Sequence, residues 1–276
     1  MARIDLTATI GGVTFPPDVW GWLDLLGDVL VGTQREAMAH DDFPADTLYK
    51  QLLVCAINRD ISSLGAIYVL LRLEHIHQAA SQIRLFCESL ITLRYIAQDV
   101  ATRAPQFLDY ANVERYEVAE SALAWEAMRA RPAHVDQVRT LLSQLQPEFD
   151  RIKPRYMFTD RKGRQRPFAS WCKASVAEQA RQCGLDRLYE IVYAQLSAYV
   201  HGSAWSLRRQ IAYSRKHYNA RVVLVDIATV VRTVLVVWEE WAKLCDEQVG
   251  WRLTPMLASV SSRLDELDAK HFPALP

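Results

Sequence analysis

Apolar residues recur at steps of three and four along most of the chain after residue 16, and this period constrains the fold more than any other feature. Prolines, glycines and short polar stretches divide the period into segments of helical length. No linker rich in Gly or Ser and no internal repeat separates these segments. The sequence therefore predicts one all-α domain of about nine helices. The helical period covers the ranges 17–40, 45–58, 62–71, 74–103, 105–129, 132–149, 170–183, 185–201, 221–247 and 255–270.

Two short stretches depart from the helical period. Residues 1–16 alternate between apolar and polar side chains around Gly11-Gly12, which predicts a small N-terminal β-hairpin arm before a helical domain at 17–276. Residues 151–168 contain Asp160-Arg161-Lys162-Gly163, which is typical of a turn between two extended pieces. The expected fold is thus an all-α single multi-helix domain with a small N-terminal β-hairpin and a basic hairpin insertion.

Composition and cysteine usage indicate a cytoplasmic protein. Half of the residues are hydrophobic, which excludes a disordered chain, and 32 basic residues balance 32 acidic ones. The five cysteines are scattered with no CxxC pair, and the first residues lack the apolar core of a signal peptide. The most apolar segment, 221–241, is interrupted by Asp226 and Arg232. We therefore expect reduced thiols and no membrane association.

Common catalytic and phosphate-binding motifs are missing from the sequence. It contains no GxGxxG, GxxxxGK[ST], GxSxG or HExxH. A di-iron bundle needs two Glu-x-x-His pairs, and only Glu74 and His77 fit that spacing. We therefore expect no cofactor and no metal site.

A polar stripe on an otherwise apolar helix is the strongest candidate for a site. Tyr193, Ser197 and His201 follow one another at steps of four, which places them on one helix face. Arg84 and Glu88 are also four apart, on a helix whose other positions are mostly apolar, so this ion pair needs further hydrogen bonds. We expect the two sets to dock. His201, Glu88, Tyr193 and Ser197 are then candidate catalytic residues, with His201 as general acid or base and Glu88 orienting it or sharing its proton. A structural seam that fixes helix register is an equally open interpretation.

Positive charge is concentrated in two stretches. Residues 151–166 carry seven bases and one acid, and residues 191–225 carry five bases and no acid, with Trp and Tyr between them. Basic loops with aromatic residues suit a phosphate backbone and unstacked bases, so RNA or a nucleotide is the expected ligand. The candidate phosphate-binding residues are Arg84, Arg161, Lys162, Arg164, Arg208 and Arg209. The same bases could instead cover acidic helices of this chain, and the sequence also leaves a homodimer open.

Three motifs give the chain a family resemblance. Gln82-Ile-Arg84-Leu-Phe-Cys-Glu88, Trp171-Cys-Lys173-Ala-Ser175 and Tyr193-Ala-Gln-Leu-Ser197-Ala-Tyr-Val-His201 follow one another in this order. Together they resemble the bacterial domain-of-unknown-function family numbered 5677, over roughly residues 62–205. The resemblance implies an all-helical prokaryotic protein and brings no established activity.

A looser likeness is to the HEPN helical ribonucleases, whose signature is an Arg, then four to six further residues, then a His on one helix. Such spacings occur at Arg35 and His40, Arg72 and His77, and Arg129 and His134. Two functions therefore stay open. One is a cytoplasmic bacterial defence or toxin-like protein acting on RNA or a phosphate-bearing ligand. The other is a non-catalytic helical interaction module.

Overall fold

The computed structural model describes residues 17–40, 46–129, 131–160, 162–168, 170–193, 196–197 and 220–272. The elements in these ranges run along the chain as follows: α1 (Pro17–Ala39), α2 (Leu48–Arg72), α3 (Ile76–Ala97), α4 (Val100–Met128), α5 (Pro132–Ile152), a 3₁₀ turn (Lys153–Tyr156), β1 (Met157–Thr159), β2 (Gln165–Pro167), α6 (Val176–Gln182), α7 (Asp186–Leu188), a π-helical segment (Tyr189–Tyr193), α10 (Ala220–Val249) and α11 (Thr254–His271). The all-α class expected from the helical period is confirmed.

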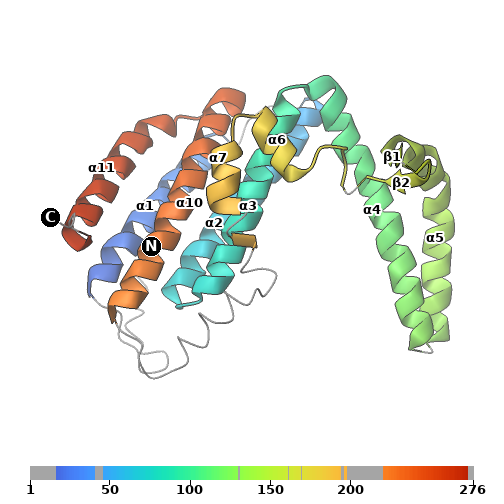
Figure 1. The fold of residues 1–276 in the computed structure, drawn as a ribbon, viewed down its shortest axis with the longest axis horizontal. Helices are drawn as coiled ribbons and strands as arrows, with labels where there is room; N and C mark the ends of the chain where they lie inside the picture. Colours follow the sequence, from blue (N-terminus) through green and yellow to red (C-terminus); the bar gives the residue numbers. More distant parts are fainter. Residues whose placement is uncertain are drawn as a thin grey trace.

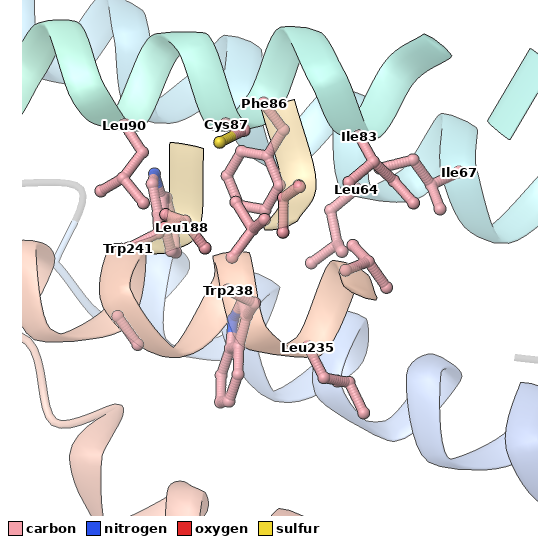
Figure 2. Close-up of a cluster of buried hydrophobic side chains, with 14 of the residues drawn as sticks. Leu64, Ile67, Ile83, Phe86, Cys87, Leu90, Leu188, Leu235, Trp238 and Trp241 are labelled. Atoms are coloured by element: carbon pink, nitrogen blue, oxygen red, sulfur yellow. The ribbon is translucent and has the colours of Figure 1, made fainter. Parts of the chain in front are cut away.

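The core lies in a bundle of α1, α2, α3 and α10, with α11 beside α1 and α10 (Figure 1). Figure 2 shows how α10 contributes Trp238 and Trp241 to the same apolar cluster as Phe86 of α3 and Leu64 of α2. The indole N–H of Trp238 donates to the hydroxyl of the buried Thr33, at 3.0 Å. Large apolar side chains on one face of each helix therefore hold the bundle together, and this buried polar pair is satisfied.

Helices α4 and α5 form a long hairpin that projects from the bundle (Figure 1). We call the arm the part of this hairpin from residue 109 to residue 152, together with the 3₁₀ turn, β1 and β2. The arm has a small hydrophobic core of its own, made of Val113, Phe149, Ile152 and Tyr156. Helices α4 and α5 therefore pack chiefly against each other, outside the bundle.

Helix α2 is continuous where the sequence predicted two helices, 45–58 and 62–71, so that boundary is wrong. Ser62 and Ser63 were expected to cap the second of them. Instead their hydroxyls donate to the carbonyls of Asn58 and Arg59 within the helix, at 2.9 and 3.1 Å. A serine hydroxyl can satisfy itself this way in a helix interior, so two serines do not require a helix start.

Other helix ends also differ from the expected positions. Pro105 was expected to stop a helix, yet it lies inside α4, where a proline removes one backbone hydrogen bond without ending the helix. The chain breaks earlier, at Asp99, whose carboxylate accepts from the amide of Thr102 at 3.3 Å. Helix α6 begins after Ser175 rather than at residue 170, because the Ser175 hydroxyl caps it through the amide of Glu178, at 3.2 Å.

The basic hairpin insertion is confirmed. Strands β1 and β2 pair antiparallel, with Met157 opposite Pro167. In the turn, one carboxylate oxygen of Asp160 accepts from the amides of Lys162 and Arg164, at 2.8 and 2.9 Å, and Gly163 adopts a φ of 75°. The N-terminal hairpin at 1–16 lies outside the described residues. It stays a prediction, as does the domain division that depends on it.

Membrane association is not tested by the fold. Of the described helices, α2 alone is long and apolar enough by length and composition to cross a bilayer. In the structure this helix packs against α1 and α3 inside the bundle. The core helix of a soluble protein passes the same composition test, and the cytoplasmic location stays a prediction.

Candidate functional site

Four residues of the predicted cluster meet between α3 and the segment after α7. The Arg84 guanidinium donates to the Tyr193 hydroxyl at 2.6 Å and to the Ser197 hydroxyl at 3.1 Å. It also lies 3.4 Å from the Glu88 carboxylate. The Tyr193 hydroxyl donates to Glu88 at 3.2 Å, and the Ser197 hydroxyl donates to the Tyr193 carbonyl at 2.8 Å. The structure therefore brings together the ion pair and the hydroxyl row as the sequence predicted.

The cluster sits at the edge of the core rather than deep inside it. The Arg84 side chain is 16% exposed and that of Glu88 is 38% exposed. Tyr193 is buried, with its ring stacked on Tyr189 at 5.0 Å between centroids. Burial and the Glu88 carboxylate raise the pKa of the Tyr193 hydroxyl. At neutral pH this hydroxyl therefore keeps its proton and acts as a donor to Glu88.

The backbone that carries Tyr193 is irregular. The sequence predicted one helix over 185–201. After the turn at Gly184, whose φ is 71°, α7 is short and continues as a π-helical segment at Tyr189–Tyr193. A π-helical turn holds one extra residue and leaves backbone hydrogen bonding weaker, and such turns occur often at functional sites. The period of apolar residues gave no signal of this turn.

The candidate phosphate-binding residues do not all join the cluster. Lys162 and Arg164 lie on the β1–β2 hairpin, which packs at the arm, apart from α7 (Figure 1). Arg164 pairs with Asp160 at 2.9 Å within the turn. These two residues are therefore separate from the Arg84 cluster. The candidates His201, Arg161, Arg208 and Arg209 lie outside the described residues.

Acidic residues of the arm neutralise much of the charge in the basic insertion. Arg155 lies 3.1 Å from Asp109 of α4. Arg151 forms a two-bond ion pair with Glu148 one turn earlier in α5. Ion pairs within the fold thus neutralise part of the positive charge of residues 151–166. This agrees with the alternative that these bases cover acidic helices.

A second polar cluster, missed at the sequence level, surrounds Asp60 of α2. The Asp60 carboxylate is 1% exposed and accepts from the Ser89 hydroxyl at 2.8 Å and from the Trp241 indole at 3.1 Å. Arg59 donates to Ser89 at 2.7 Å. Burial raises the pKa of Asp60 to about 6. Asp60 follows Leu53 and Ile57 at helical steps, which places an acid on the apolar face of α2. This pattern in the sequence could have predicted a buried carboxylate.

Metal and thiol chemistry find little support in the described parts of the chain. No three His, Cys, Asp or Glu side chains converge there in a way that could hold a metal ion. Burial raises the pKa of Cys87 to about 12 and that of Cys183 to about 11. Both thiols therefore stay protonated at neutral pH, where the thiolate would be the nucleophile.

The HEPN-type spacings fall at helix ends. Arg72 ends α2 whereas His77 belongs to α3. Arg129 follows α4 whereas His134 belongs to α5. The third spacing runs past the end of α1. Two of the three spacings therefore join different helices, and the likeness to HEPN ribonucleases stays a prediction.

The fold and the cluster together define an all-helical bundle protein with a projecting arm and an Arg-Glu-Tyr-Ser site at the bundle edge. The sequence model of DUF5677, a family of unknown function, matches residues 50–217. This match covers more than half of the chain, so the chain belongs to that family, as the three motifs implied. No curated protein and no solved structure matches the chain.

Proposed function

We propose that the Arg84, Glu88, Tyr193 and Ser197 cluster binds and acts on a phosphate-bearing ligand, with RNA as the expected polymer, in a bacterial defence or toxin-like protein. The observation that carries the proposal is the meeting of a guanidinium, a carboxylate and a protonated phenol at a place that water reaches through Glu88. The π-helical segment under Tyr193 supports it, because such turns recur at functional sites.

Each group has a role that fits its surroundings. Arg84 supplies a planar donor for phosphate oxygens and would stabilise the negative charge that builds up in phosphoryl transfer. Glu88 is the most exposed member and is suited to accept or share a proton. Tyr193 holds Glu88 in place as a donor. His201, four residues beyond Ser197 in the sequence, is proposed as the general acid or base.

The test compares two Glu→Gln variants, one in the cluster on α3 and one outside it on α10. The purified full chain is incubated with a mixed-sequence single-stranded RNA, and binding and cleavage are measured. Glu88→Gln keeps the shape of the side chain but removes the charge, and it should abolish cleavage while leaving the melting temperature nearly unchanged. Glu247→Gln is the control. Glu247 is exposed, lies outside the cluster and pairs with Arg94, which is on α3 like Arg84.

Two results would overturn the proposal: no binding or cleavage of RNA by the wild-type chain, or equal activity of Glu88→Gln and wild type. Growth of cells adds a second measurement. Expression of the wild type should slow growth, and His201→Ala should restore it.

A second candidate function is favoured by the closure of the hydrogen-bond network. The Arg84 guanidinium finds acceptors in Tyr193 and Ser197, and both hydroxyls find acceptors in turn. A network closed in this way suits a register device in a non-catalytic interaction module. Arg84→Met should then lower the melting temperature and change nothing in RNA binding, whereas the first proposal expects RNA binding to be lost.

A further inference from the structure

A shallow apolar groove follows one face of the arm. Its volume is about 440 Å³, and its apolar lining comes from both helices of the hairpin. The lining residues that matter here are Ala111, Val118, Ala122, Val138, Leu141 and Leu145. Val118 is 68% exposed and Leu141 is 41% exposed. Apolar side chains of this size are thus left in water on an element that already stands clear of the bundle (Figure 1).

The spacing of these residues is that of a helix-bundle seam. On α4 the groove positions Ala111, Val118 and the half-exposed Trp125 beyond them repeat every seven residues. On α5 Val138 and Leu145 repeat in the same way. A seven-residue apolar repeat is typical of helices that pack against further helices. The hairpin already buries Val113 and Phe149 in its own seam, so this second seam is left for another pair of helices.

We propose that a second copy of this chain packs its arm onto the groove, so that the two arms complete a four-helix bundle. An apolar face of a helical hairpin can pack on the same face of a second copy across a two-fold axis, which is the commonest symmetry of homo-oligomers. This inference does not depend on the proposed activity.

The size of the face is sufficient for a dimer. The 21 residues of α5 span about 30 Å, and two helices side by side are about 20 Å wide. The outline of one whole arm face is therefore about 600 Å². Two arms that pack along this whole length, beyond the groove itself, bury about 1,200 Å² in total, which reaches the lower end of the range for stable protein–protein interfaces. Small residues at Ala111 and Ala122 allow a close approach of the second pair of helices.

Sedimentation equilibrium of the full chain over a wide range of concentrations tests the proposal. The wild type should have twice the 31.5 kDa mass of the chain. Val118→Glu and Leu141→Glu should each sediment as a monomer, because each places a pair of charges in the apolar seam. Val69→Glu is the matched control and should stay dimeric, since Val69 is 52% exposed on α2, away from the arm.

Circular dichroism checks that the variants fold. We expect them to fold because Val118 is mostly exposed and Leu141 is partly exposed within one chain. A wild type that is monomeric at every concentration would overturn the proposal. So would folded Val118→Glu and Leu141→Glu variants that remain dimeric.

Discussion

Replacement of Asp60 by Asn should change how stability depends on pH. The carboxylate lies among Ser89, Trp241 and apolar side chains, with the Arg59 guanidinium 3.6 Å away. Burial outweighs these partners and raises the pKa of Asp60 from the ordinary value of 3.8 to about 6. The folded protein therefore holds a proton that the unfolded chain has already lost. The corresponding stabilisation is fully present below about pH 4 and is lost as the pH rises through about 6. The difference between the two pKa values corresponds to about 3 kcal/mol in the free energy of unfolding. Asn has no such titration and can accept from the same two donors.

The assay is urea unfolding of wild type and Asp60→Asn at a series of pH values, followed by circular dichroism. The free energy of unfolding of the wild type, relative to the variant, should fall by about 3 kcal/mol between about pH 4 and about pH 7. Asp46→Asn is the control with the opposite sign, because Lys50 lowers the pKa of the exposed Asp46. The reasoning would be refuted if the free energy of unfolding of the wild type, relative to that of Asp60→Asn, did not change with pH or increased as the pH rises.

Two further predictions, each with a control variant, test the fold by the same unfolding assay. Gly184→Ala should cost about 1–2 kcal/mol, because Gly184 has a φ of 71° while an added Cβ meets no atom within 4 Å, so the cost comes from the backbone alone. Gly65→Ala, with equal space but inside α2, should instead stabilise the protein by up to about 1 kcal/mol, and a loss there would contradict the argument. Thr33→Val should cost about 1–3 kcal/mol, because the buried indole N–H of Trp238 loses its acceptor. Thr33→Ser keeps that hydroxyl and should be milder; equal losses in the two variants would point to packing instead.

The sequence predicted helices well where local signals decide them. Pro17 begins α1 and the apolar period carries it to Ala39, within one residue of the expected end. The break expected after Asn58 was wrong, because α2 runs on through Asp60, Ser62 and Ser63. Ser89 and Trp241, far away in the chain, donate to one oxygen of the buried Asp60 carboxylate. No local pattern contains those partners.

The candidate site also has one part that the sequence predicted and another that it could not predict. The spacing of Arg84 and Glu88, and of Tyr193 and Ser197, was enough to predict that two polar stripes would meet, because residues four apart share a helix face. The π-helical segment at Tyr189–Tyr193 depends on how the chain packs and gave no periodic signal. The separation of Lys162 from the cluster could not be predicted either, since it depends on the direction in which the arm leaves the bundle.

The separate core of the arm has a consequence for how the molecule opens. Val113, Phe149, Ile152 and Tyr156 share no buried member with the main cluster, although the partly buried Tyr110 packs against both. We therefore expect the arm to open while the bundle stays folded. Amide protons of the arm should then exchange with solvent through this partial opening, whereas those of α3 and α10 should exchange only when the whole bundle unfolds.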